Sequence, residues 1–259
     1  AWRVPFVIGG VFGLISIYLR RFLQETPVFK KMRESKALAK FPLEEVVKTS
    51  RFGIWISMFI TWVLTGCIVV FILLMPGFVG GVLGFSPFET TYFQMGGLVC
   101  IVSSCWLTGR LADKHNPSTL CILFSAGFAV SSVAFFSLLY TAAPVVSEVV
   151  LAYFATCFFA GIMNFCPIFM CDVFPARIRF SGISFAYNIA YALSGAFTPQ
   201  LSFALHAYAK THPDTLGAMG LSAYIVFLAL VSIGTALAMR RVYKNGGAAV
   251  SQMEFRPAP

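Results

Sequence analysis

The hydrophobic and polar residues of this chain are arranged in long alternating blocks. Each hydrophobic block has about 20 residues, which is enough for an α-helix to cross a hydrocarbon core of about 30 Å. The blocks cover residues 4–19, 52–75, 90–109, 118–140, 148–170, 181–206 and 218–239. The pattern predicts an all-α membrane protein with seven transmembrane helices. Most connections are short, so neighbouring helices are expected to run antiparallel.

One connection is much longer and more polar than the others. It covers residues 20–51 and separates a lone first helix, residues 1–19, from a block of six helices, residues 52–239. A polar tail follows at residues 240–259. We therefore expect four parts: a single helix, a basic central loop, a six-helix bundle and a tail.

The composition narrows the class of protein further. Hydrophobic residues make up 58% of the chain and charged residues 11%. Soluble domains have about 25% charged residues, so a water-soluble enzyme is excluded, and the high hydrophobicity excludes a disordered chain. A β-barrel is disfavoured because its strands alternate apolar and polar residues. The seven Cys form no CxxC pair and no Cys–His cluster. We therefore expect free thiols, no metal site and no cofactor.

The net charge of +9 follows the predicted topology. If the seven spans alternate in direction, all 19 Lys and Arg fall on one side except Arg3 and Lys210. Cytoplasmic loops of membrane proteins are enriched in these residues. We therefore expect a multi-pass protein of the bacterial inner membrane with a cytoplasmic C-terminus. Nucleic-acid binding is not needed to explain the charge.

The alternation also places the first residue outside the cytoplasm. The chain starts with Ala1 directly at a span, with neither a basic leader nor a cleavage signal before it. An outside N-terminus without an export signal suggests that further helices precede this one. We therefore expect the chain to be the C-terminal part of a larger protein.

The first helix and its surroundings resemble a known family. Residues 2–6 read WRVPF, residues 19–21 read LRR and residues 25–29 read ETPVF. These segments resemble the start and end of the sixth helix, and the beginning of the central loop, in the metabolite:proton symporter branch of the major facilitator superfamily.

Two later segments carry the same resemblance. Residues 174–182 (FPARIRFSG), followed by Tyr187 and Asn188, are similar to a loop and the eleventh helix of that branch. Residues 109–114 (GRLADK) are similar to the cytoplasmic turn of the superfamily. The resemblance covers essentially the whole chain, as helices six to twelve of twelve.

The resemblance implies a fold, an activity and partners. The fold consists of two six-helix halves around a central cavity, each built from inverted three-helix repeats, and residues 20–51 would link the halves. The implied activity is proton-coupled symport of a small metabolite. Members of the branch carry proline and glycine betaine, or carboxylates such as 2-oxoglutarate, citrate and shikimate. The partners would be this substrate, protons, the lipid bilayer and the missing N-terminal helices, in the same or a separate chain.

The candidate site lies on a polar stripe in the span 181–206. Successive members are three or four residues apart, which aligns them on one helical face. They are Ser184, Tyr187, Tyr191, Ser194 and Thr198, with Asn188 beside them. In lipid such a stripe must face protein or water, so it predicts either a substrate cavity or interhelical hydrogen bonds.

Other polar residues near span midpoints are candidates for the same cavity. Thr61 and Trp62 lie in the second span and Asn164 in the fifth. Glu148 is the one charged residue inside the predicted spans. It is interpreted either as a carboxylate at the positive end of a helix dipole or as a proton-coupling or gating group. If the protein is a symporter, the scarcity of such groups places the coupling residue in the missing half.

Charged residues cluster at two places on the predicted cytoplasmic side. The first group is Arg110 and Asp113, with Gly109 beside them in the same turn, and the second is Asp172, Arg177 and Arg179. They are interpreted either as positive-inside charge with local pairing or as a latch between helices that is made in one state and broken in the other.

Two other classes of membrane protein are less consistent with the sequence. A retinal pigment needs a Lys within a span, and the predicted spans contain none. A membrane enzyme is disfavoured because His206 is the only His within a span and the sequence has no HExxH or paired-Asp grouping. We therefore expect a secondary active transporter and no enzyme. A receptor-like or degenerate, non-transporting membrane protein is the alternative.

Overall fold

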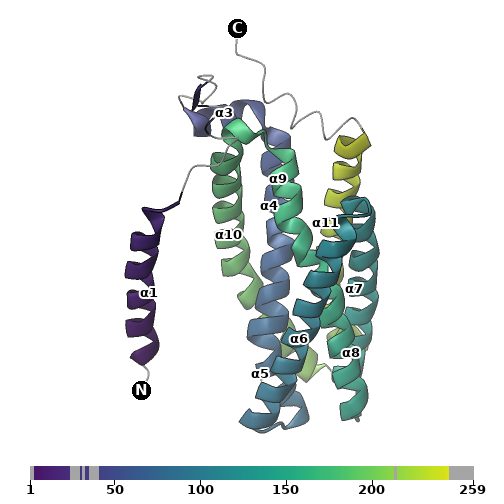
Figure 1. Ribbon diagram of the computed structural model, residues 1–259. Helices are drawn as coiled ribbons and strands as arrows, with labels where there is room; N and C mark the ends of the chain where they lie inside the picture. The colour runs from purple at the N-terminus through teal and green to yellow at the C-terminus, as the bar shows by residue number, and fades with distance from the viewer. Residues whose placement is uncertain (1–2, 24–29, 31–32, 35–40, 213–214, 245–259) are drawn as a thin grey trace. The chain divides into compact units, whose positions relative to one another are not determined.

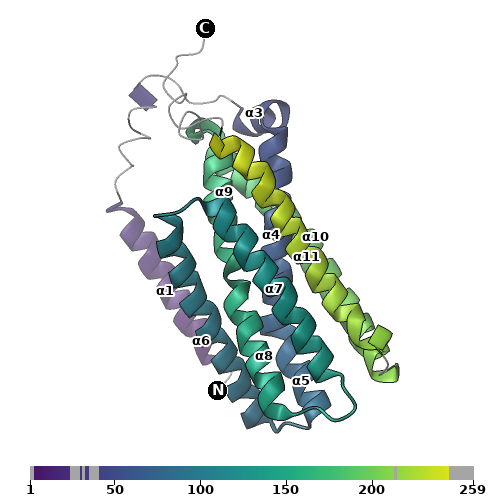
Figure 2. The same ribbon diagram turned by 90° about the vertical axis from the view of Figure 1, so that its right-hand side faces the viewer.

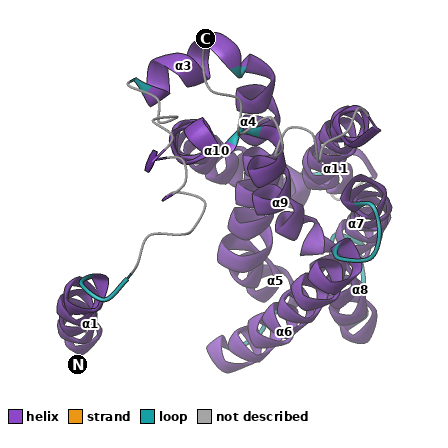
Figure 3. Ribbon diagram, turned by 45° about the horizontal axis from the view of Figure 1, so that its top comes forward, coloured by secondary structure: helices purple, strands orange, loops and turns teal. Residues whose placement is uncertain are grey.

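The computed structural model describes residues 3–23, 30, 33–34, 41–212 and 215–244. These residues form helices joined by short loops and turns, without a strand among them (Figure 3). The predicted all-α fold is confirmed. The chain divides into two units, residues 1–40 with 255–259 and residues 41–254, which are described separately.

The first unit contains α1 (Val4–Arg20), which matches the predicted helix at 4–19. Pro5 occupies the first turn, where its missing N–H leaves no hydrogen bond unmade. With 17 residues, α1 is about 25 Å long. The motif residue Trp2, the segment 25–29 and the tail beyond residue 244 lie outside the described residues.

The second unit is a helix bundle (Figure 1). Its elements are α3 (Pro42–Thr49), α4 (Arg51–Cys67), the π-helical η1 (Ile68–Leu74), α5 (Met75–Leu83), α6 (Pro87–Ala112), α7 (Pro117–Leu139), α8 (Val146–Phe159), the 3-10 helix η2 (Ala160–Asn164), α9 (Phe165–Val173), α10 (Ala176–Thr211) and α11 (Thr215–Lys244). Together with α1, the elements other than α3 form seven continuous helical rods, and each rod overlaps one of the seven predicted spans.

The rods differ in how apolar they are. Five of them are long and apolar enough to cross a membrane: Arg51–Leu83, Pro87–Ala112, Pro117–Leu139, Val146–Val173 and Met219–Lys244. The apolar α1 is shorter, and α10 has 36 residues but is more polar than these five. The described part of the chain is therefore a multi-pass membrane protein in which one rod, α10, is unusually polar.

Within the bundle, α4 contacts α9, α10 and α11, whereas α7 contacts α8 and α11. In Figure 1, α4 lies between α10 and α11, and Figure 2 shows α6, α7 and α8 on one side of the bundle with α10 and α11 on the other. The most extensive contact joins α7 to α11. The interior is rich in aromatic rings: Phe71 on η1 packs against Phe128, Phe135 and Phe136 of α7, with ring centroids 5.5–6.5 Å apart.

In the first turn of α5, directly after the π-helical η1, a proline interrupts the helical hydrogen-bond ladder. Pro76 has no N–H to donate to the carbonyls four and five residues earlier, at Ile72 and Phe71. The preceding Met75 N–H bonds five residues back, to the Val70 carbonyl. The side chain of Gln94 on α6 donates to that carbonyl at 2.9 Å, and Tyr153 on α8 donates to the neighbouring carbonyl of Phe71 at 2.9 Å. Side chains thus satisfy backbone groups that would otherwise face hydrocarbon unpaired.

The predicted central loop is partly helical, because α3 forms within residues 20–51. Its Val46 is fully buried, whereas Val47 is 44% exposed. Glu45 of α3 accepts an ion-paired hydrogen bond of 2.8 Å from Arg177 at the start of α10. These contacts place α3 in the second unit, so the bundle's unit begins before residue 52, the boundary expected from hydropathy.

Candidate functional site

The first half of the predicted α10 stripe lies at the surface of the bundle. Asn188 is exposed, Tyr191 is 41% exposed, and Ser184 and Tyr187 are half-buried. The rings of Tyr187 and Tyr191 stack with centroids 5.4 Å apart. The Asn188 amide donates to the Ser184 carbonyl of its own helix at 2.7 Å. We call these four residues the α10 polar face.

The second half of the stripe is buried. Ser194 donates to the Ala190 carbonyl at 2.6 Å, and Thr198 is fully buried against α11. The division has a geometric cause. The buried residues of α10 recur every four positions, and a step of four residues turns about 40° beyond a full circle. The row of buried residues therefore winds around α10, whereas the polar stripe runs nearly parallel to the helix axis. The two rows meet at Ser194.

The buried half of the stripe joins a network across three helices. The Thr198 hydroxyl lies 2.7 Å from the Tyr224 hydroxyl of α11, and Trp62 Nε1 of α4 donates to the same oxygen at 3.2 Å. The Trp62 ring also meets Phe197 and Phe227 edge to face, with centroids 6.3 and 6.2 Å away. The structure thus brings Trp62 and Thr198 together through a residue that the sequence analysis did not single out.

Thr61 and Asn164 serve helix contacts in this structure. Thr61 is fully buried, and its hydroxyl lies 3.8 Å from Cys166 Sγ of α9. Asn164, at the end of η2, donates from Nδ2 to the Cys105 carbonyl and to Thr108 Oγ1 of α6, each at 3.2 Å. For these two residues, the contacts match the interhelical hydrogen bonding that a polar residue in a span predicts.

Glu148 lies away from these residues. It is exposed in the first turn of α8, where a carboxylate complements the helix dipole. Among the described residues the structure gives its carboxylate no hydrogen-bond or ion-pair partner. The position fits the dipole interpretation, and nothing in the geometry assigns a proton-coupling role to it.

The predicted group at the end of α6 makes contacts within its own helix and with η2. Arg110 lies over the Trp106 ring, 4.1 Å from its centroid. Asp113 is the C-cap residue of α6. A side chain at Gly109 would come within 3.4 Å of Asn164 Nδ2, so Gly109 permits the close approach of η2.

The predicted group around the start of α10 makes contacts among four helices, α3, α9, α10 and α11. Asp172 accepts a hydrogen bond of 2.5 Å from the Tyr243 hydroxyl of α11. Arg177 pairs with Glu45 of α3, and Arg179 Nε donates to the Phe174 carbonyl at 3.0 Å. Asp172 and Arg177 therefore do not pair with each other. The partner of each lies on another helix, Tyr243 for Asp172 and Glu45 for Arg177.

A further polar contact lies near the other ends of the helices. The Tyr140 hydroxyl is 2.5 Å from His206 Nδ1, and the His206 ring stacks on Phe78 at 4.0 Å. These side chains connect α5, α10 and the C-terminal end of α7. The described residues contain no group of three His, Cys, Asp or Glu side chains placed to hold a metal ion.

The sequence analysis missed several of these partners. A tyrosine inside a span needs a partner for its hydroxyl, which is a signal that would have drawn attention to Tyr224. Pro76 frees a carbonyl, and that signal would have suggested a donor such as Gln94 on a neighbouring helix. No sequence signal identifies Glu45 as the partner of Arg177, because the pairing depends on how α3 folds back onto α10.

Comparison with known proteins gives one family. A sequence model described as Major Facilitator Superfamily matches residues 1–199. The inner membrane metabolite transport protein YhjE of Escherichia coli K12 is 29% identical over 234 residues, which are 85% of this chain and 50% of that protein. A putative proline/betaine transporter of Staphylococcus haemolyticus is 23% identical over 76% of this chain and 42% of its own length.

A third relative also matches over only part of its own length. A putative metabolite transport protein of Haemophilus influenzae is 24% identical over 90% of this chain and 53% of its own length. The chain thus spans about half the length of the curated relatives it matches. No solved structure matches the chain significantly.

Proposed function

The chain belongs to the major facilitator superfamily, a family of membrane transporters rather than enzymes, and on that premise we propose that it forms part of a proton-coupled symporter for a small metabolite. In this proposal residues 52–239 form the C-terminal six-helix half, and α1 is the last helix of the other half. The remaining helices, in the same or a separate chain, complete the carrier. A carrier of this type moves its solute by rocking one bundle against the other around a central site.

The observation that carries the proposal is the polarity of α10. The other five long rods are apolar enough for lipid, and α10 is not. Its polar face exposes Asn188 and part of Tyr191. Polar side chains are costly against hydrocarbon, so in a membrane this face needs protein or water beside it. A water-filled solute path between two bundles supplies both.

The chemistry of this face suits a solute with little net charge. Its side chains are hydroxyls, an amide and two stacked phenol rings, without a charged group among the four. Aromatic faces attract quaternary ammonium groups, and the S. haemolyticus relative bears the name of a putative proline/betaine transporter. We therefore propose a zwitterionic osmolyte of the proline or glycine betaine type, with an organic acid as the second class.

We further propose the orientation that the charge pattern predicts. The basic ends of α4, α10 and α11 and the helix α3 then face the cytoplasm, and the protein lies in the bacterial inner membrane. The proton-coupling group belongs to the helices outside this chain, or to Glu148 if the chain itself supplies it. Either position requires the complete carrier for transport.

Uptake of labelled solutes into cells tests the proposal. The chain is expressed with the remaining helices of its carrier, and proline, glycine betaine, 2-oxoglutarate, citrate and shikimate are compared with and without a protonophore. We expect uptake of one compound, abolished by the protonophore and absent when the 259 residues are expressed alone. Failure of all five solutes, with the protein verified in the membrane, would favour a receptor-like or degenerate protein.

A further inference from the structure

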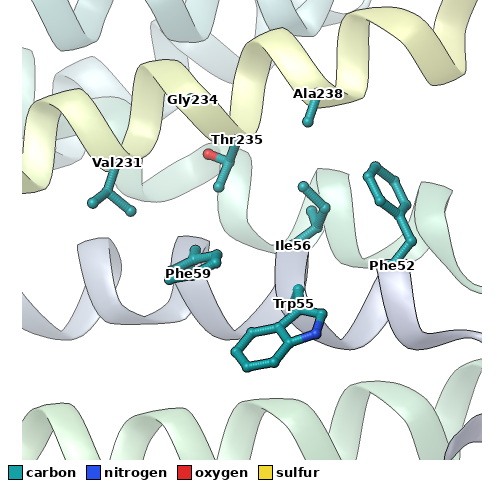
Figure 4. Close-up of a pocket in the computed structure, with 8 residues that line it drawn as sticks. All are labelled: Phe52, Trp55, Ile56, Phe59, Val231, Gly234, Thr235 and Ala238. Carbon is teal, nitrogen blue, oxygen red and sulfur yellow. The ribbon is translucent and has the colours of Figure 1, made fainter.

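A groove runs between α4 and α11 on the surface of the second unit. Its volume is about 330 Å³. Figure 4 shows its lining side chains, which come from one face of each helix: Phe52, Trp55, Ile56, Phe59, Val231, Gly234, Thr235 and Ala238. Along each helix the lining covers seven residue steps, or about 10 Å. Thr235 supplies the one hydroxyl, so the groove is apolar along its length.

The aromatic side of the groove is open to the surroundings. Trp55 is 58% exposed, Phe52 is 49% exposed, and the Trp55 and Phe59 rings stack with centroids 5.9 Å apart. Gly234 lies opposite them with no atom within 4 Å of the place where its side chain would be. The groove is therefore a real gap between the helices, deepened by a missing side chain on α11.

Two arginines lie just beyond one end of the groove. Arg51 directly precedes Phe52 at the start of α4, and Arg241 lies one helical turn beyond Ala238 on α11. Both are exposed, and neither makes an ion pair with any residue that the structure describes. Because α4 and α11 run antiparallel, the start of one and the end of the other bring these cations to the same end of the groove.

We propose that this groove is a binding site for an anionic phospholipid. One acyl chain occupies the gap beside Gly234, and the headgroup phosphate meets Arg51 and Arg241. Basic clusters at the cytoplasmic ends of transmembrane helices commonly recognise anionic headgroups. A transmembrane helix is a poorer occupant. A helix is about 10–12 Å wide, so it would not enter the gap, and it would leave the two cations without counter-charge.

Native mass spectrometry of the purified 259-residue chain tests this site without any need for transport. The chain is incubated with equal amounts of dioleoyl phosphatidylglycerol and dioleoyl phosphatidylcholine, which have the same acyl chains but an anionic and a zwitterionic headgroup. We expect preferential retention of phosphatidylglycerol. The double variant Arg51→Gln/Arg241→Gln should reduce this retention about 25-fold, since each cation near a headgroup contributes about fivefold. Lys114→Gln removes an exposed cation from the turn after α6 and should leave retention unchanged.

A second pair of variants tests the acyl-chain position. Gly234→Leu adds a side chain at a position where a Cβ meets no atom within 4 Å, and should lower retention of both lipids by occupying the groove. Gly77→Leu, at a helical position that is equally open, is the matched control. Equal retention of the two lipids, or retention that the groove variants leave unchanged, would overturn the proposal. So would a photo-crosslinker at position 234 that captures α1 or a second copy of the chain instead of lipid.

Discussion

At the scale of single residues, two asparagines that look alike in the sequence have different roles. Asn164 donates from Nδ2 to two oxygens of a neighbouring helix, whereas Asn188 donates to a carbonyl of its own helix. The difference separates residues that hold the bundle together from residues that remain available to a solute. It also gives a pair of substitutions in which one is the control for the other.

We predict that Asn164→Ala destabilises the bundle by about 1 kcal/mol, the range measured for interhelical hydrogen bonds in membranes. The substitution leaves the Cys105 carbonyl and Thr108 Oγ1 without the amide donor of η2. Unfolding by increasing SDS in mixed micelles measures the change. Asn188→Ala should leave stability unchanged. An equal loss in both variants would contradict the separation of roles.

A second prediction concerns the carbonyl freed by Pro76. Gln94→Leu leaves the Ile72 oxygen unpaired and should lower stability by about 1 kcal/mol. Pro76→Ala returns a backbone N–H to this turn, so Gln94→Leu should cost less in that background. The double-mutant cycle is read from the same unfolding transition. A cost that is the same with and without Pro76 would show that Gln94 does not act on this carbonyl.

At the scale of elements, hydropathy predicts the positions of the long helices well and the contacts between helices poorly. The seven predicted spans all appear as helices, because an apolar segment in lipid must satisfy its backbone hydrogen bonds internally. Five of them are long and apolar enough to cross a membrane. The helix α3 was not expected, because eight residues of amphipathic sequence carry too weak a signal by themselves. Pairings such as Arg177 with Glu45 depend on contacts between distant segments, which the order of residues does not encode locally.

The docking of α3 leads to a prediction at this scale. Val46→Asp places a carboxylate in a fully buried position, which costs at least about 2 kcal/mol, so α3 should detach from the bundle. Trypsin should then cleave after Lys48 more than about tenfold faster, since proteolysis follows local opening. The Val47→Asp variant changes a neighbouring, exposed residue. Trypsin should cleave this variant after Lys48 at the same rate as the unsubstituted protein. Similar rates in both variants would mean that α3 is not held by Val46.

The candidate site shows the same limit of sequence reasoning within one helix. Periodicity correctly aligned the stripe on α10, but it treated all six positions alike. The structure divides them, because the row of buried residues winds around α10, crosses the stripe and includes Ser194 and Thr198. Which half of a polar stripe is covered depends on how its helix crosses its neighbours, and that crossing is a property of the packed bundle.

At the scale of the whole molecule, two surfaces of the bundle have opposite chemistry. The α10 polar face is neutral and hydrogen-bonding, which suits a solute path. The groove between α4 and α11 is apolar with cations at one end, which suits lipid. The chain belongs to the major facilitator superfamily, and the central proposal that goes beyond this membership is that the α10 polar face lines the path of a solute.

Cysteine accessibility tests that claim most directly. Asn188→Cys and Leu193→Cys are made in the complete carrier with Cys171, the exposed native cysteine, replaced by Ser, and treated in membranes with a hydrophilic maleimide. Leu193 is 63% exposed on a different face of α10. We predict that position 188 is labelled, that the transported solute slows this labelling, and that position 193 is unreactive. Equal reactivity at the two positions, or labelling at 193 alone, would contradict the account.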